Sequence, residues 1–412
     1  MIKAVFLDLD STLLRIDTDV FVRDYIMGMV ALTLKLHPAL ADSPISVGKG
    51  SQIATRAVMT NLDPDRSNIE IYLEGMLNTL GLSPDQLTEI VTKFQGDSFA
   101  LLGKDAGPAE GAQELIDRLA TMGLRAVIAT NPVFNLDAVM QRLSWAGLDN
   151  PPVPYAFISN IDELHFGKPN PHYYEELLAR VGVEPEETIM VGDNLSDDIL
   201  PAAQAGINTF WINAEQPLPA EFPAEFAPDG IGSLADFERK VSEGWLTGLT
   251  PRPRTIGQVI PRLMGNVGAL YGLVETIKPE FWLMRPDPNE WSPLEIVCHL
   301  RDSERNIQRP RLQRIASEDN PFISQAQPSP GPGERDLSGE DGPTALREFW
   351  NERCITLNFL HELTPEQWSA PARHSIFGPT TLLEMAHFTA RHDHLHINQL
   401  CETVGRCRKE LF

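Results

Sequence analysis

The sequence predicts an α/β domain with a parallel sheet and an inserted helical segment, followed by an all-α four-helix bundle. Short apolar runs rich in β-branched residues alternate with segments of helical spacing through the first half of the chain. Between residues 15 and about 107 the alternation stops, and only helical patterning occurs. After about residue 247, four amphipathic helical stretches follow without strands, which is typical of a helix bundle.

The elements of the first half are predicted from apolar spacing and from glycines that end helices. Strands need short buried runs, whereas helices need apolar residues three or four apart and a terminal stop signal. The predicted strands are 3–10, 125–131, 188–194 and 207–212, and the predicted helices are 109–123, 135–147 and 171–182.

The domain boundaries follow from these elements and from two Pro-rich passages. We expect a core made of residues 1–14 and 108–246, a helical insertion at 15–107 and a bundle at 247–412. The passage "GLTPRPRTIG", residues 248–257, is the expected linker. The bundle helices are predicted at 255–278, 292–318, 342–363 and 379–404.

Charge and composition exclude several classes of function. The chain has 412 residues and a net charge of −23, and residues 1–245 hold 36 acidic against 16 basic residues. Such an acidic surface disfavours nucleic-acid binding. No apolar run reaches the ~18 residues of a membrane span, and the N-terminus "MIKAVFLDLD" does not resemble a signal peptide. We therefore expect a cytoplasmic protein that binds neither nucleic acid nor a membrane.

Polar residues suited to phosphate chemistry gather where the predicted strands end. The carboxyl ends of parallel strands open onto the ligand crevice of such a sheet, so these side chains are expected to meet. They are Asp8 and Asp10 in "DLDST", Thr130 and Asn131 in "IATN", Lys168 in "HFGKP", and Asp193, Asp197 and Asp198 in "GDNLSDD".

These four motifs, in this order, resemble those of the haloacid dehalogenase (HAD)-like hydrolase superfamily, over about residues 1–245. "DLDST" departs from the commoner family motif by Ser11 in place of Gly. The resemblance implies a HAD-type, Rossmann-like parallel sheet with a helical cap at 15–107. It also implies that Asp8 is the nucleophile and Asp10 the general acid and base. Ser11, Thr12, Thr130, Asn131 and Lys168 are then the expected phosphate ligands.

Carboxylates and a dianionic phosphate cannot share one site without a cation. Mg²⁺ prefers oxygen ligands, and we expect it on Asp8, Asp193 and the Asp10 backbone carbonyl. Asp197 and Asp198 are both candidates to orient the metal shell or Lys168, with the Asp-Ile pairing in favour of Asp198. Family members that cleave carbon–halogen bonds lack an acid at the Asp10 position. Asp10 therefore favours hydrolysis of a small phosphorylated metabolite, and a phosphomutase remains an alternative.

The second set of candidate residues lies in "HFTARHDHLH", residues 387–396. On a helix, His392 and His396 share one face because they are four residues apart, whereas His387 and His394 share another. We expect the latter two to be surface residues or to lie behind the metal ligands. Asp393 is not expected to be a ligand. His299 in "EWSPLEIVCHLRDSE" is the candidate third imidazole.

This pattern resembles the DinB-like superfamily of metal-binding four-helix bundles, over roughly residues 255–405. The resemblance implies that His299, His392 and His396 bind a divalent metal, either Zn²⁺ or Ni²⁺. Three imidazoles leave a coordination position open, as in catalytic sites. Three alternatives remain for the bundle: an adjunct to the hydrolase, a thiol or group transferase, or a docking module through which the chain forms a homodimer.

Overall fold

The computed structural model describes residues 1–43, 45–213, 216–326 and 330–409. Its contacts divide the chain into two units, Met1–Pro253 and Arg254–Phe412. The division falls inside the expected linker, a few residues beyond 247. Among the described residues, no helix combines the length and apolar character needed to cross a membrane.

The first unit is built on a six-stranded sheet in the order β5-β4-β1-β6-β7-β8, in which every pair is parallel. The four predicted strands are present, which confirms the parallel α/β class. The two outermost strands, β5 and β8, were not predicted because each has only two or three residues. The strands are β1 (Ala4–Leu7), β4 (Arg125–Ile128), β5 (Phe157–Ile158), β6 (Thr188–Gly192), β7 (Asn208–Ile212) and β8 (Gly230–Gly232).

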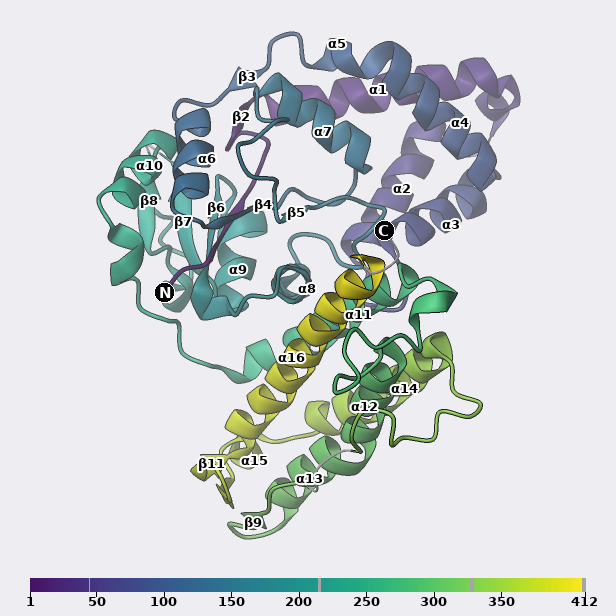
Figure 1. Cartoon of the computed structure of the whole chain (residues 1–412). Coiled ribbons are helices and arrows are strands. Elements are labelled where there is room, and N and C mark those ends of the chain that lie inside the picture. Colours follow the sequence, from purple (N-terminus) through teal and green to yellow (C-terminus); the bar gives the residue numbers. More distant parts are fainter. Residues whose placement is uncertain (44, 214–215, 327–329, 410–412) are drawn as a thin grey trace. The chain divides into compact units, whose positions relative to one another are not determined.

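Helices cover both faces of this sheet (Figure 1). On one face the main core includes Leu7 of β1 and Val191 of β6, packed against α6 (Ala112–Thr121), α7 (Leu136–Trp145) and α10 (Leu234–Ser242). On the other face lie α8 (Pro171–Val181) and α9 (Leu200–Gln204). The central strands are therefore buried on both sides, as their continuous apolar runs predict.

The helical insertion begins and ends on a two-residue ribbon, in which β2 (Leu14–Arg15) pairs antiparallel with β3 (Gly107–Pro108). Between them the chain forms a helical cap, drawn in purple and blue in Figure 1. A π-helical turn, Gln95–Phe99, precedes the last short helix. The cap helices are α1 (Thr18–Leu36), α2 (Val47–Met59), α3 (Asn68–Leu80), α4 (Pro84–Phe94) and α5 (Ala100–Leu102).

Aromatic rings join the cap to the core. Phe21 and Tyr25 of the cap lie 5.8 and 4.9 Å from the ring of Phe134, which follows β4. Phe99 of the cap stacks at 5.4 Å on Trp145 of α7. Such tilted and stacked pairs add to the stabilisation from burial alone.

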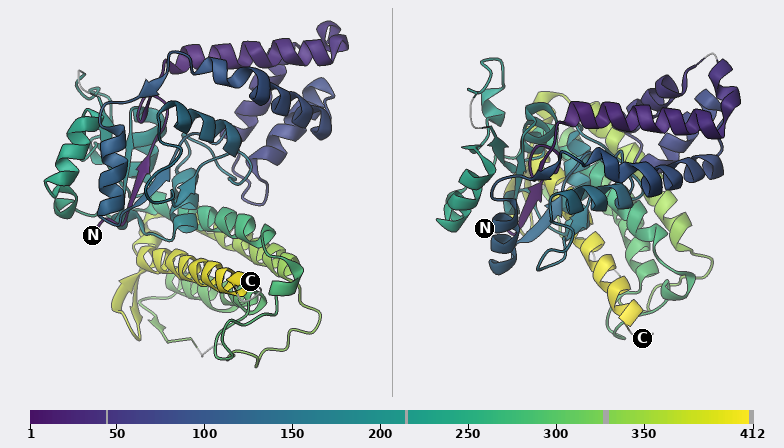
Figure 2. Two further views of the ribbon diagram at one scale, coloured as in Figure 1. Left: turned by 45° about the horizontal axis from the view of Figure 1, so that its top comes forward. Right: turned by 90° about the horizontal axis from the view of Figure 1, so that it is seen from above.

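The second unit is a bundle of helices that lie side by side (Figure 2). The stretch predicted as one helix at 292–318 is divided by a π-helical segment, Glu304–Gln308. Pro310 explains the division, since it has no N–H for a regular helical ladder. The helices are α11 (Val259–Glu275), α12 (Pro293–Ser303), α13 (Arg309–Ser317), α14 (Gly342–His361), α15 (Pro365–Trp368) and α16 (Leu382–Lys409).

The expectation of a second unit without strands is wrong in one detail. β9 (Phe322–Ile323), β10 (Pro371–His374) and β11 (Gly378–Thr381) form a small sheet in the order β11-β10-β9. The last helix therefore starts at Leu382 rather than at 379. Glu384 fixes this start, because its carboxylate accepts the backbone N–H of Thr381.

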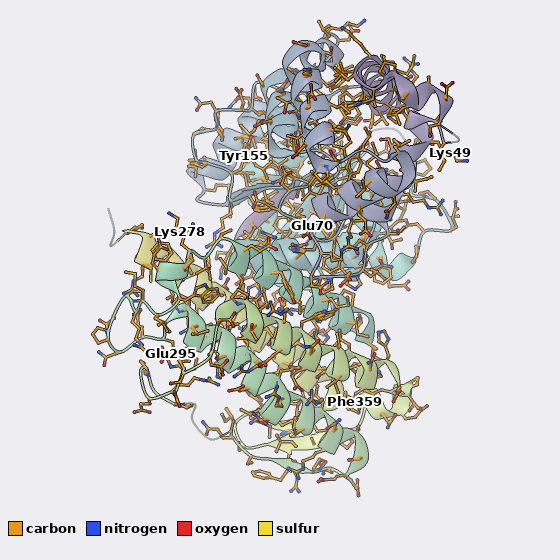
Figure 3. All side chains as sticks on the ribbon, turned by 90° about the vertical axis from the view of Figure 1, so that its right-hand side faces the viewer. Lys49, Glu70, Tyr155, Lys278, Glu295 and Phe359 are labelled. Carbon is orange, nitrogen blue, oxygen red and sulfur yellow. The ribbon has the colours of Figure 1, made fainter. Side chains whose placement is uncertain are left out.

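The start of α12 is fixed by a capping box. The Ser292 hydroxyl accepts the N–H of Glu295, and the Glu295 carboxylate accepts the N–H of Ser292 at 2.8 Å. Glu295, labelled in Figure 3, is buried and also accepts the Gly333 N–H at 2.8 Å. The carboxylate therefore ties the loop that precedes α14 to the start of α12.

Candidate functional site

The strand register brings the predicted acidic residues to one edge of the sheet. Leu7, the last residue of β1, pairs with Ile128 of β4 and with Val191 of β6. Asp8 therefore lies at the same level as the ends of both neighbouring strands, from which Thr130 and Asp193 follow. This is the edge at which parallel α/β sheets bind their ligands.

Lys168 connects two of the carboxylates. Its Nζ donates to Asp8 Oδ1 at 2.8 Å and to Asp198 Oδ1 at 2.5 Å, and the lysine side chain is 2% exposed. Ligand oxygens of Asp8, Asp193 and Asp198 all lie within 4.8 Å of one another. The three acids and the lysine thus form one cluster, in which Asp8, Asp198 and Lys168 are buried and Asp193 is partly exposed.

The turn after β6 selects Asp198 over Asp197. The Asp198 carboxylate accepts the N–H of Asn194 at 3.0 Å and lies against Gly192, where a Cβ would come within 2.2 Å of Asp198 Oδ2. Asp197 is partly exposed, and its backbone carbonyl accepts the hydroxyl of Tyr174. The geometry therefore agrees with the preference for Asp198 as the partner of Lys168.

A buried glutamate that the sequence reasoning missed holds the loop of Lys168. Glu176 of α8 accepts the backbone N–H of His165 at 3.0 Å and of Phe166 at 3.3 Å. Its other oxygen lies 2.9 Å from His165 Nδ1 and 3.0 Å from Arg180 Nε. Nothing in the helical spacing of α8 distinguishes this glutamate from a surface residue.

The cluster has an excess of negative charge. Burial first, and then the Asp8 charge, raise the pKa of Asp193 to about 6. Burial also raises the pKa of Asp198. Burial disfavours the charged form of Lys168, yet the charges of Asp198 and Asp8 outweigh it and raise the lysine pKa. Three carboxylates whose oxygens lie within 4.8 Å of one another, two of them paired with Lys168, are a donor set that fits a hard divalent cation.

Asp10 has a partner that the sequence did not indicate. Arg142 of α7, 1% exposed, donates from Nη1 to Asp10 Oδ2, and its guanidinium lies 4.6 Å from the ring centre of Phe134. Burial raises the pKa of Asp10, which Arg142 opposes and Asp8 reinforces. Within the described part of the chain, Asp10 Oδ1 has no hydrogen-bond partner, so this oxygen is free to carry a proton.

The remaining predicted phosphate ligands lie in different surroundings. The Thr12 hydroxyl donates to Asp193 Oδ1 at 3.4 Å, and the buried Thr130 follows β4 with its carbonyl bonded to Tyr173. Asn131 directly follows Thr130, and its Oδ1 is buried. Ser11 has φ 62°, the left-handed conformation that glycine adopts easily. Its hydroxyl donates a hydrogen bond to the Ile16 carbonyl and so stabilises the turn that leads to the cap.

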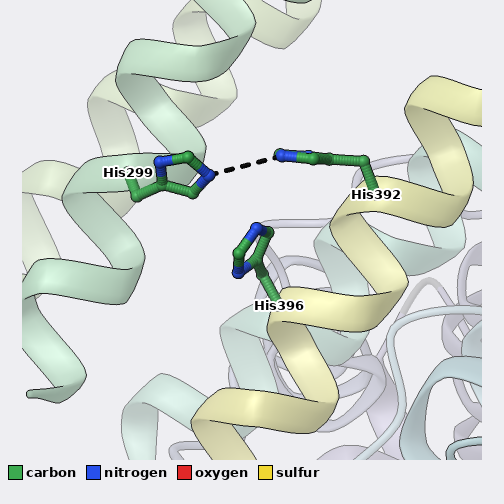
Figure 4. Close-up of side chains that lie close together, drawn as sticks. All are labelled: His299, His392 and His396. Carbon is green, nitrogen blue, oxygen red and sulfur yellow. Dashed lines mark hydrogen bonds between the residues drawn. The ribbon is translucent and has the colours of Figure 1, made fainter. Parts of the chain in front are cut away.

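In the second unit the three predicted histidines converge from two helices (Figure 4). His299 of α12 and His392 of α16 place their Nε2 atoms 3.3 Å apart. The His396 ring centre lies 4.4 Å from that of His299 and 4.6 Å from that of His392. The ring of Trp291 lies 4.8 Å from His299 and stacks at 5.9 Å on His396.

The electrostatics favour the neutral form of two of these imidazoles, His299 and His396. Burial and then His396 and His392 lower the pKa of His299 to about 3, and burial also lowers the pKa of His396. His396 Nδ1 lies 2.8 Å from Gln399 Oε1, so it is the donor and Nε2 keeps its lone pair. Three imidazoles whose ring nitrogens lie within 4.8 Å of one another fit a divalent transition metal.

Among the other polar residues of α16, Asp393 adjoins this cluster, with its Oδ1 3.6 Å from His392 Nδ1. The Asp393 carboxylate accepts Arg353 Nη2 at 2.7 Å, and Arg353 also pairs with Glu304. His387 and His394 are 3% and 4% exposed, so of the two places expected for them the surface is wrong. They pack inside the unit because α16 is buried on more than one side, and His387 Nε2 lies 3.1 Å from the Thr255 carbonyl.

Comparisons with known proteins divide the chain in the same way. Residues 2–206 match the family described as haloacid dehalogenase-like hydrolase, and residues 267–400 match the DinB superfamily. Pyrophosphatase PpaX of Halalkalibacterium halodurans is 34% identical over 154 residues, which are 36% of this chain and 66% of that protein, slightly less than two thirds. Glyceraldehyde 3-phosphate phosphatase of Methanothermobacter thermautotrophicus is 27% identical over 219 residues, or 52% of this chain and 87% of that protein.

A crystal structure of a HAD phosphatase from Thermococcus onnurineus is 20% identical, with a TM-score of 0.35, and covers 59% of this chain and 98% of that chain. The sequence motifs, the parallel sheet with its inserted cap and the family matches agree. Residues 2–206 of this chain belong to the haloacid dehalogenase-like hydrolases, and residues 267–400 belong to the DinB superfamily.

Proposed function

We propose that the first unit is a Mg²⁺-dependent phosphatase that hydrolyses a small phosphomonoester through an aspartyl-phosphate on Asp8. The single observation that carries this proposal is the buried ion pair between Lys168 Nζ and Asp8 Oδ1 at 2.8 Å, beside a cluster of carboxylates. The lysine orients one oxygen of Asp8 and leaves the other for attack on phosphorus. The relatives named above, a pyrophosphatase and a glyceraldehyde 3-phosphate phosphatase, act on phosphorylated compounds.

The reaction takes place in two displacements. The free oxygen of Asp8 attacks phosphorus, the bond from phosphorus to the ester oxygen breaks, and Asp10 gives its proton to that oxygen. Water then attacks the aspartyl-phosphate, Asp10 accepts a proton from the water, and phosphate leaves as Asp8 is restored. The raised pKa of Asp10 suits the first of these roles.

The charge of the phosphoryl group needs cationic partners. Lys168 and the Thr130 hydroxyl would hold its oxygens as charge develops. Asp8, Asp193 and the Asp10 backbone carbonyl would hold Mg²⁺, with Asp198 beside them. When bound, the ion would neutralise the phosphate and polarise the bond to phosphorus.

Phosphate release from small phosphomonoesters tests this proposal. We expect activity with Mg²⁺, its loss with EDTA and its return when Mg²⁺ is added again. Asp8→Asn should abolish turnover because an amide is not a nucleophile for this step. Asp105→Asn, in which the altered side chain is 90% exposed, is the matched control and should keep wild-type activity. Turnover by Asp8→Asn at the wild-type rate would exclude Asp8 as the nucleophile.

We also propose that the second unit binds one divalent transition metal, Zn²⁺ or Ni²⁺, through His299, His392 and His396. The convergence of three imidazoles, two of which place their Nε2 atoms 3.3 Å apart, supports this proposal, since imidazole nitrogens that face one another are typical ligands of such metals.

Metal analysis of the purified full-length chain tests this site. We expect one equivalent of Zn²⁺ or Ni²⁺ in the wild type and far less in His299→Ala. His361→Ala alters an exposed histidine at the end of α14 and should retain the metal. Absence of metal from the wild type, with a mass that rises with protein concentration, would instead favour a docking or dimerisation module.

A further inference from the structure

A cavity of about 470 Å³ lies between the cap and the core. Its cap side is formed by α1, α2, α3 and α4, and its core side by residues 133–135 and 161–162. These core segments follow β4 and β5, so they belong to the same edge of the sheet as Asp8. The volume is in the range of cavities that bind small organic molecules.

The wall of this cavity is mainly apolar. Tyr25, Met59, Tyr72, Leu73 and Val91 line it, and all five are only partly buried. Apolar side chains that are only half-buried and face a shared cavity still have accessible surface that a ligand can cover. Among the residues that line the cavity, only Arg56 and Asp162 carry a charge.

The cavity adjoins the phosphate end of the site at Asn131. This residue directly follows Thr130, and its Oδ1 is buried without a partner among the described residues. A Cβ at Gly167, the residue before Lys168, would lie 3.3 Å from Asn131 Oδ1 and 3.7 Å from the Met59 Cα. Thus the lysine loop, the free amide oxygen and the cavity wall meet at one place.

We propose that the substrate is a phosphomonoester of an apolar alcohol, with an alkyl chain of about six carbons or a single ring in this cavity. The proposal rests on the phosphatase function proposed above and specifies its substrate class. With the phosphoryl group at Asp8, the organic part enters the hollow lined by Tyr25, Tyr72 and Leu73.

The wall argues against strongly polar leaving groups. A polyhydroxy chain or an amino acid would lose hydrogen bonds to water wherever it meets the apolar part of the wall, although polar side chains such as Arg56, Gln95 and Asp162 also line the cavity. An apolar group gains free energy instead, because it leaves water and covers exposed tyrosine and leucine surface. This difference predicts that the site prefers phosphomonoesters whose organic group has a larger apolar area.

A series of esters with the wild-type, full-length protein and Mg²⁺ tests the inference. We expect kcat/KM to rise roughly fourfold for each added methylene from ethyl to hexyl phosphate. Phenyl phosphate should exceed phosphoserine and glyceraldehyde 3-phosphate. Equal rates for all esters, or preference for the two polar ones, would overturn the substrate class and leave the phosphatase function standing. Release of phosphate from none of them would overturn both.

A pair of variants locates the effect in the cavity. Val91→Trp fills the hollow from α4 and should lower the ratio of hexyl to ethyl phosphate kcat/KM at least tenfold. Ile53→Trp makes a similar change at a position on α2 that does not line the cavity and is 41% exposed, so the ratio should remain. An unchanged ratio in a folded Val91→Trp would contradict the assignment. If that variant does not fold, the ester series with the wild type decides.

Discussion

At the scale of single residues, Gly192 determines where Asp198 can lie. A Cβ there would come within 2.2 Å of Asp198 Oδ2, so Gly192→Ala must displace the carboxylate that holds Lys168. We expect a loss of about 1–3 kcal/mol in the free energy of unfolding, as for overpacked buried sites. Because a shift of about 1 Å can cost about 100-fold in rate, kcat/KM for phosphate release should fall by a similar factor.

Gly96→Ala provides the matched control for this prediction. It lies in the π-helical turn of the cap, and among the described residues no heavy atom outside its own helical backbone and chain neighbours lies within 4 Å of the added Cβ. Both the melting temperature and the phosphate release should stay close to those of the wild type. Gly192→Ala would contradict the role of this glycine if it behaved in the same way.

The residues that could be predicted are those that stand directly at strand ends. Asp8, Thr130 and Asp193 follow apolar runs. Because parallel strands end at the same edge of a sheet, residues that follow neighbouring strands lie close together. Arg142 and Glu176 could not be predicted, because their roles depend on partners in other segments. In the sequence both are ordinary charged residues of amphipathic helices, and their burial appears only when the helices pack on the sheet.

At the scale of elements, the start of α12 depends on the charge of Glu295. Arg285 and the N–H groups of Ser292 and Gly333 lower the pKa of this buried carboxyl to about 2, although burial opposes the shift. A carboxyl whose pKa falls on folding stabilises the protein above its unfolded pKa of about 4.5, and this contribution disappears as the pH falls towards 2.

We therefore expect Glu295→Gln to lower the free energy of unfolding by about 2 kcal/mol at pH 7, after allowance for solvent screening of the partly exposed Arg285. The difference in the free energy of unfolding between this variant and the wild type should fall to about half of its pH 7 value at pH 3. Calorimetric melting of both full-length proteins between pH 7 and pH 3 measures it. Glu280→Gln alters an exposed residue, and its melting should match that of the wild type over the whole pH range. A difference that is constant with pH would show that the charge is not the cause.

Long periodic helices were predictable, whereas short elements and interruptions were not. The helix predicted at 342–363 corresponds to α14, Gly342–His361, because its capping residue Asp341 and its apolar spacing are both local signals. The hairpin of β10 and β11 has no such signal, since four-residue strands with Pro and Gly read as loops. Its stability comes from pairing between the two strands, which is a tertiary effect.

At the scale of the whole molecule, each candidate site is complete within one unit. The carboxylates, Lys168 and the cap cavity all belong to residues before Pro253, and the three histidines belong to residues after it. Residues 1–245 hold 36 of the 57 acidic but only 16 of the 34 basic residues, and this uneven charge and the two family matches point to the same division. We infer that each unit of the chain carries its own site, and that the two sites have no ligating residue in common.

This inference predicts that the two sites can be removed separately. Asp8→Asn should abolish phosphate release and leave the transition-metal content of the full-length protein unchanged, because no histidine ligand is altered. His299→Ala should lower the metal content and leave kcat/KM for phosphate release within about twofold of the wild type, since no carboxylate or cap residue is altered. Both variants are measured in both assays. A tenfold loss of phosphate release in His299→Ala, with an unchanged melting profile, would show instead that the histidine site acts on the hydrolase.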